Sequence, residues 1–87
     1  MRPTRLYDAA CDVLIAAQEL RRIAEANDAE PVMAPTLGCL QECLGELART
    51  FAALEPSGPA GALENVVDDL EVAGRAAEAA RAAAVSR

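Results

Sequence analysis

The chain has 87 residues, a length that suits one domain with a small core to which oligomerisation can add. Its only aromatic residues are Tyr7 and Phe51, and helix-forming alanine is abundant, so the composition predicts an all-α fold. The net charge of -6 opposes binding to phosphate backbones, and no apolar run is long enough to span a bilayer. Nucleic acid and membrane are therefore not expected as partners.

Residue usage also suggests where the protein works. The basic residues are eight arginines with no lysine, which we interpret as the trace of a GC-rich, bacterial coding sequence. Asp8 and Asp12 interrupt any export signal near the N-terminus, and the three cysteines cannot all pair within one chain. We therefore expect a cytoplasmic protein with free thiols, although export without a cleaved signal stays open.

A first helix is predicted over about residues 4–28, with Thr4 as its N-cap and Asn27 near its end. Its apolar residues recur at heptad spacing, as in a packed helix. They form the stripe Leu6, Ala9, Val13, Ala16, Leu20 and Ile23.

This helix also carries a second apolar face, made of Tyr7, Cys11, Leu14 and Ile15, which lies outside the stripe. A helix that is apolar nearly all round needs two neighbours. Either it sits centrally in the monomer and both other helices cover it, or the second face forms a homodimer interface. We favour the homodimer, because the alanine-rich third helix is a poor cover.

A second helix is predicted over about residues 35–55, with Pro35 in its first turn, and it contains the stretch LGCLQECLGEL. Its stripe follows an unbroken heptad pattern over Leu37, Leu40, Leu44, Leu47, Phe51 and Leu54. Gly38 and Gly45 lie seven residues apart inside this helix, where glycine is unfavourable. We interpret Gly38, Gly45 and Cys43 as a flank against which another backbone packs closely.

Cys39 and Cys43 lie four residues apart, at the border of the stripe rather than at its centre. Their Cβ atoms should be too far apart for an intrahelical disulfide. The helical Cys-x3-Cys pair resembles the cuprous-ion sites of cysteine-lined four-helix bundles, a resemblance limited to these two residues. It implies a soft-metal site, Cu(I) or Zn(II), as an alternative function, which needs further thiolates from a second copy. Our main interpretation is that small cysteine side chains fill a helix border and that no metal or other cofactor is bound.

A third helix is predicted over about residues 59–85, and its stripe fades from leucine and valine to alanine along Leu63, Val66, Leu70, Ala73, Ala77, Ala80 and Ala84. Glu64, Asp68 and Glu71 line one face of this helix. We interpret this acidic face as mainly solvated, with docking of a basic partner as its functional alternative.

Together these elements predict a single domain over residues 1–87, a three-helix, up-down-up antiparallel bundle that forms a homodimer. The chain has no histidine, no predicted strand and no glycine-rich phosphate loop, so we expect no enzyme. The predicted function is a protein-interaction, scaffold or regulatory module whose partner is a second copy of itself. The alternatives are a soft-metal binder using Cys39 and Cys43, and a regulatory subunit that docks a larger partner through the acidic face.

Overall fold

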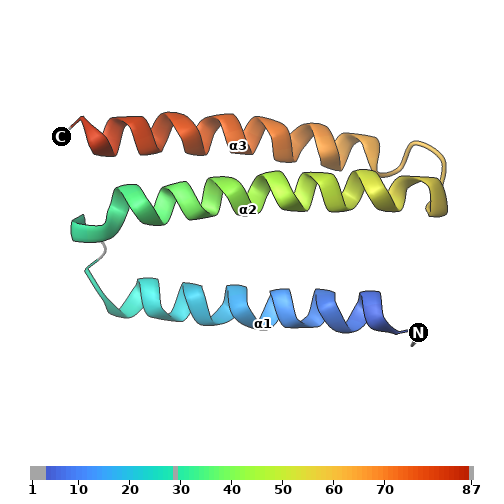
Figure 1. Cartoon of the computed structure of the whole chain (residues 1–87), viewed down its shortest axis with the longest axis horizontal. Coiled ribbons are helices and arrows are strands. Elements are labelled where there is room, and N and C mark those ends of the chain that lie inside the picture. Colours follow the sequence, from blue (N-terminus) through green and yellow to red (C-terminus); the bar gives the residue numbers. More distant parts are fainter. Residues whose placement is uncertain (1–3, 29, 87) are drawn as a thin grey trace. The chain divides into compact units, whose positions relative to one another are not determined.

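The computed structural model describes residues 4–28 and 30–86, and over these residues the chain is helical with no strand (Figure 1). The predicted all-α class is therefore confirmed for the described residues. Three α-helices of 22 residues each are joined by short connections that contain two 3-10 turns. The order is α1 (Arg5–Ala26), η1 (Glu30–Val32), α2 (Met33–Leu54), η2 (Glu55–Ser57) and α3 (Glu64–Val85).

The chain divides into two compact units, Met1–Pro31 with α1 and Val32–Arg87 with α2 and α3. The first unit is a single helix with a defined start and end. Thr4 is its N-cap residue as predicted, but its hydroxyl donates to the Asp8 carboxylate at 3.3 Å and makes no capping bond to the backbone. At the other end, the Asn27 side-chain amide donates to the carbonyl of Ile23 at 2.9 Å and satisfies one terminal acceptor.

The second unit is a helical hairpin in which α2 and α3 run antiparallel and contact each other along their lengths (Figure 1). Helix α2 begins at Met33, so Pro35 lies in its first turn, where its missing N–H costs no intrahelical bond. Every residue of the predicted α2 stripe is half-buried, as is the α3 stripe except for the exposed Ala80. The heptad pattern thus marks the faces that the hairpin covers.

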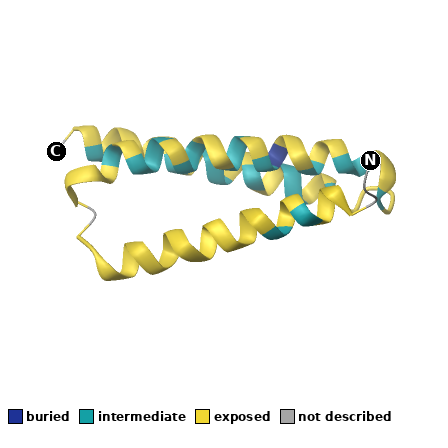
Figure 2. Ribbon diagram, turned by 60° about the horizontal axis from the view of Figure 1, so that its bottom comes forward, coloured by how far each residue is buried: buried dark blue, intermediate teal, exposed yellow. Residues whose placement is uncertain are grey.

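The hairpin is packed most tightly around Ala48, which is 7% exposed and is the one buried residue among those described (Figure 2). Ala48 lies four residues after Leu44, beside the predicted stripe, and its small side chain lets α3 approach closely. No large side chain is fully buried in the described chain. The core of the hairpin is therefore thin, as the alanine-rich composition predicts.

The connection from α2 to α3 is longer than predicted, because α3 begins at Glu64 and not near residue 59. After η2 the backbone turns, with the Ala62 amide donating to the Pro59 carbonyl at 3.1 Å, and Gly61 takes a φ of +72°. That left-handed conformation is incompatible with a continuing helix and favours glycine. Helix formation therefore starts only after Leu63, the N-cap residue of α3.

None of the described helices is both long and apolar enough to cross a membrane. The antiparallel pairing of α2 with α3 is part of the predicted bundle. The up-down-up order of all three helices and the homodimer remain predictions.

Candidate functional site

The second face of α1 is a solvent-accessible apolar patch. Tyr7, Ile15 and Leu14 are 70%, 62% and 57% exposed, and Cys11 between them is half-buried with a free thiol. On a helix with 100° between residues, this patch lies roughly opposite the stripe. Both faces of α1 contribute exposed apolar residues: Leu6, Val13, Leu20 and Ile23 of the stripe are also exposed.

The apolar patch on α1 is confined to the N-terminal half of the helix. In the C-terminal half, Arg21 pairs with Glu25 at 2.8 Å and Arg22 with Glu19 at 2.5 Å. The hydrogen bonds from Arg22 to Glu19 raise the pKa of the Arg22 guanidinium. This change from apolar to charged residues marks where the second face of α1 ends.

On α2, Cys39 and Cys43 are both exposed and unoxidised, one helical turn apart on the same side. No group of three or more histidine, cysteine, aspartate or glutamate side chains within metal-binding reach occurs among the described residues. The two thiols alone would leave at least two tetrahedral positions to other ligands. A soft-metal site completed by thiolates of a second copy therefore stays a prediction from the sequence.

The two glycines of α2 have different surroundings. A Cβ atom at Gly38 would lie 3.3 Å from Cδ of Arg81 on α3, so this position meets a side chain of the neighbouring helix closely. A Cβ atom at Gly45 would meet only the guanidinium of Arg49 on its own helix, at 3.7 Å. Cys43 does not share the flank of Gly45, since residues two apart on a helix point about 200° apart. Gly45 lies beside α3, whereas Cys43 is exposed away from it.

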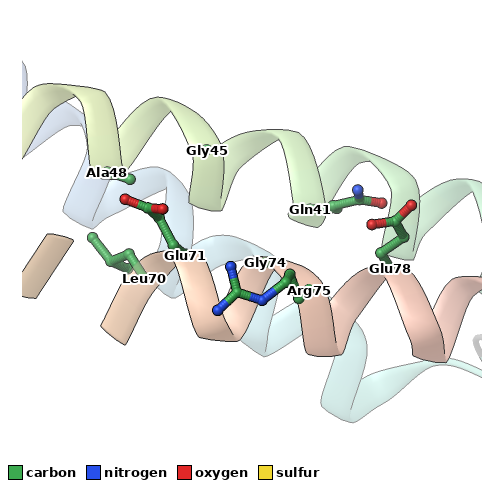
Figure 3. A pocket seen from close by; sticks show the side chains of 8 residues that line it. All are labelled: Gln41, Gly45, Ala48, Leu70, Glu71, Gly74, Arg75 and Glu78. Atoms are coloured by element: carbon green, nitrogen blue, oxygen red, sulfur yellow. The ribbon is translucent and has the colours of Figure 1, made fainter. Parts of the chain in front are cut away.

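Gly45 belongs to a shallow groove of about 280 Å³ on the α2–α3 hairpin (Figure 3). The floor is formed by Gly45 on α2 and Gly74 on α3, with Ala48 and Leu70 at one end. A Cβ atom at Gly74 would meet nothing within 4 Å. Both helices thus carry glycine in the lining of the groove, and the space beside Gly74 is open.

Charged and polar side chains border this groove. Glu71 and Glu78 extend from α3 towards α2 on either side of Gly74, Gln41 faces Glu78 from α2, and Arg75 lies between the two glutamates (Figure 3). Arg75 has glutamates at the i−4 and i+3 positions yet forms an ion pair with neither. Elsewhere in the described chain some arginines do pair with a glutamate three or four residues away, as Arg49 does with Glu46 at 2.7 Å. The hydrogen bond from Arg49 to Glu46 raises the pKa of Arg49.

The acidic face predicted on α3 is exposed at all three of its positions, Glu64, Asp68 and Glu71. Only Glu71 borders the groove. The groove residues that the sequence analysis did not single out are Gln41, Ala48, Gly74, Arg75 and Glu78. For Gly74 a signal was present, since a glycine midway along a predicted helix usually has a packing or functional reason.

Comparison with known proteins adds no assignment to these surfaces. No protein-family model matches the chain, and neither a curated protein nor a solved structure is significantly similar to it.

Proposed function

We propose that the chain is a non-enzymatic protein-interaction module that self-associates through the second face of α1. The observation that carries the proposal is the exposure of large apolar side chains on two roughly opposite sides of one helix. A neighbouring helix covers a single stripe, so whatever covers one face of α1 leaves the other available. Exposed apolar patches of this kind typically mark interaction sites.

The size of the second face indicates a weak interface. Tyr7, Leu14 and Ile15 are 70%, 57% and 62% exposed. With roughly 200 Å² for one fully exposed large residue, they amount to roughly 400 Å². That is about half of the roughly 800 Å² that each partner contributes to a standard interface, so we expect a weak dimer.

The layout of the patch favours a second copy as the partner. Cys11 lies at its centre, with Tyr7 four residues before it and Ile15 four residues after it. If two α1 helices pair antiparallel about a two-fold axis at Cys11, Tyr7 of each copy meets Ile15 of the other. Such a self-complementary surface is what a symmetric dimer requires. The charged C-terminal half of α1 then lies beyond the contact and stays in solvent.

Light scattering on the full chain at high micromolar concentration tests this proposal. We expect a mass near twice the 9.1 kDa of one chain, and a shift towards one chain on dilution. Leu14→Asp places a charge in the patch and should give a monomer at every concentration. Val72→Asp puts the same charge on an exposed apolar position of α3 and should leave the dimer intact. A strict monomer in the unmodified chain, or a dimer that both variants leave unchanged, contradicts the proposal.

A further inference from the structure

The groove between Gly45 and Gly74 has no occupant within the described hairpin. A glycine inside a helix costs about 0.5–1 kcal/mol relative to alanine. At Gly74 no neighbouring atom would obstruct a Cβ, and at Gly45 only the flexible end of Arg49 lies nearby. Packing of α2 against α3 therefore does not require glycine at either position. The presence of glycine at both positions therefore needs another explanation. A side chain of a partner molecule that enters the hollow between them supplies one.

The shape of the groove suits a protein partner better than a small molecule. Its volume of 280 Å³ lies just below the range of about 300–1,000 Å³ typical of small-molecule pockets, and the groove is open to solvent. An open groove cannot enclose most of a small ligand. Small residues on facing helices instead allow the backbone of a further helix to come close, with one side chain inserted between Gly45 and Gly74.

The charge around the groove indicates the chemistry of that helix. Glu71 and Glu78 border the hollow, and neither forms an ion pair with another residue that the structure describes, although Arg75 lies between them. Residues 32–87 contain eight acidic residues against four arginines, so the hairpin as a whole is negative. A second copy of this hairpin would bring the same net charge, whereas a helix with lysine or arginine beside an apolar side chain complements both carboxylates.

We propose that the α2–α3 groove binds a basic amphipathic helix of another protein. An apolar side chain of that helix enters the hollow between Gly45 and Gly74, and its cations pair with Glu71 and Glu78. This site lies entirely within the hairpin and is separate from the self-association surface on α1. It gives the module one surface for a second copy and another for a different protein.

Two synthetic peptides serve as probes for the full-length chain. Both have the same helical stripe of leucine and alanine, and their remaining positions carry lysine and arginine in one and glutamate in the other. Fluorescence anisotropy of the labelled basic peptide should show saturable binding at one peptide per chain. Its affinity should fall at least tenfold between low and high salt, because exposed charges are screened. The acidic peptide should not bind. Absence of binding by the basic peptide, or equal binding of both, overturns the proposal.

Matched variants separate the groove from general acidity. Gly74→Leu fills the hollow without changing charge and should weaken the basic peptide at least tenfold, whereas Ala76→Leu, at an exposed position outside the groove, should change it less than twofold. The double variant Glu71→Gln, Glu78→Gln should weaken binding of the basic peptide about tenfold. The double variant Glu64→Gln, Asp69→Asn removes the same charge elsewhere on α3 and should weaken binding about twofold at most. Circular dichroism checks that each variant keeps its helices. If the groove variants and their controls lose the same amount of affinity for the basic peptide, binding is non-specific charge attraction and the proposed site is wrong.

Discussion

The glycine in the middle of α3 permits a direct test of the space beside it. Gly74 is the eleventh of the 22 residues of α3, and a Cβ atom there would meet nothing within 4 Å. Gly74→Ala therefore gains the full difference in helix propensity, about 0.5–1 kcal/mol in the free energy of unfolding. For a chain of this length, that gain raises the midpoint of thermal unfolding by about 2–8 °C.

A matched substitution at Gly61 should change the free energy of unfolding in the opposite direction. Its φ of +72° disfavours any residue with a Cβ atom, so Gly61→Ala should destabilise the chain by about 1–2 kcal/mol even though no atom lies within 4 Å of the added methyl group. Urea and thermal unfolding, followed by far-UV circular dichroism at low micromolar concentration, measure both changes without self-association. A destabilised Gly74→Ala chain would show that the groove is filled in solution, and a stabilised Gly61→Ala chain would refute the left-handed turn.

Three further predictions concern the core and the thiols. Ala48→Leu adds volume at the buried residue of the hairpin and should cost about 1–3 kcal/mol in the free energy of unfolding by urea. Ala53→Leu, at an exposed position of the same helix, should cost little, and equal effects would contradict the packing around Ala48. Cys39 and Cys43 should both react rapidly with a disulfide reagent in native buffer, and fewer than two fast thiols would argue against their exposure. Oxidation of the protein by diamide, at a high micromolar protein concentration, should join two copies by a disulfide between their Cys11 residues. Cys11→Ser should prevent this cross-link, whereas the double variant Cys39→Ser, Cys43→Ser should still form it. The reverse pattern would show that the contact between copies lies on α2.

The periodicity of the sequence was sufficient to predict the helical class and the covered faces of the hairpin. The α2 stripe from Leu37 to Leu54 is half-buried at every predicted position, because heptad spacing places those residues on one side of a helix whatever it packs against. The end of α1 was predicted equally well, since Asn27 is a residue that favours helix termini. The start of α3 was not, because no propensity indicates that Gly61 adopts a left-handed conformation and delays the helix to Glu64.

The candidate surfaces were likewise predictable from the sequence only in part. The residues of the second face of α1 follow from spacing alone, whereas their exposure is known only from the structure. The flank predicted from Gly38, Gly45 and Cys43 combined residues on different sides of α2, since positions two apart cannot face one neighbour. The surroundings of the glycines could be known only from the facing helix: Arg81 lies against Gly38, whereas Gly74 lies across from Gly45.

The amino-acid sequence by itself therefore determined three helices, their apolar stripes and the acidic balance, because these depend on local propensity, on 3.6-residue periodicity and on counting charges. Only the tertiary structure decided that glycines from two different helices line one hollow and that Glu71 and Glu78 border it. The physical reason is that a groove is formed by what two elements jointly leave empty. That depends on the register between α2 and α3, which no single helix specifies.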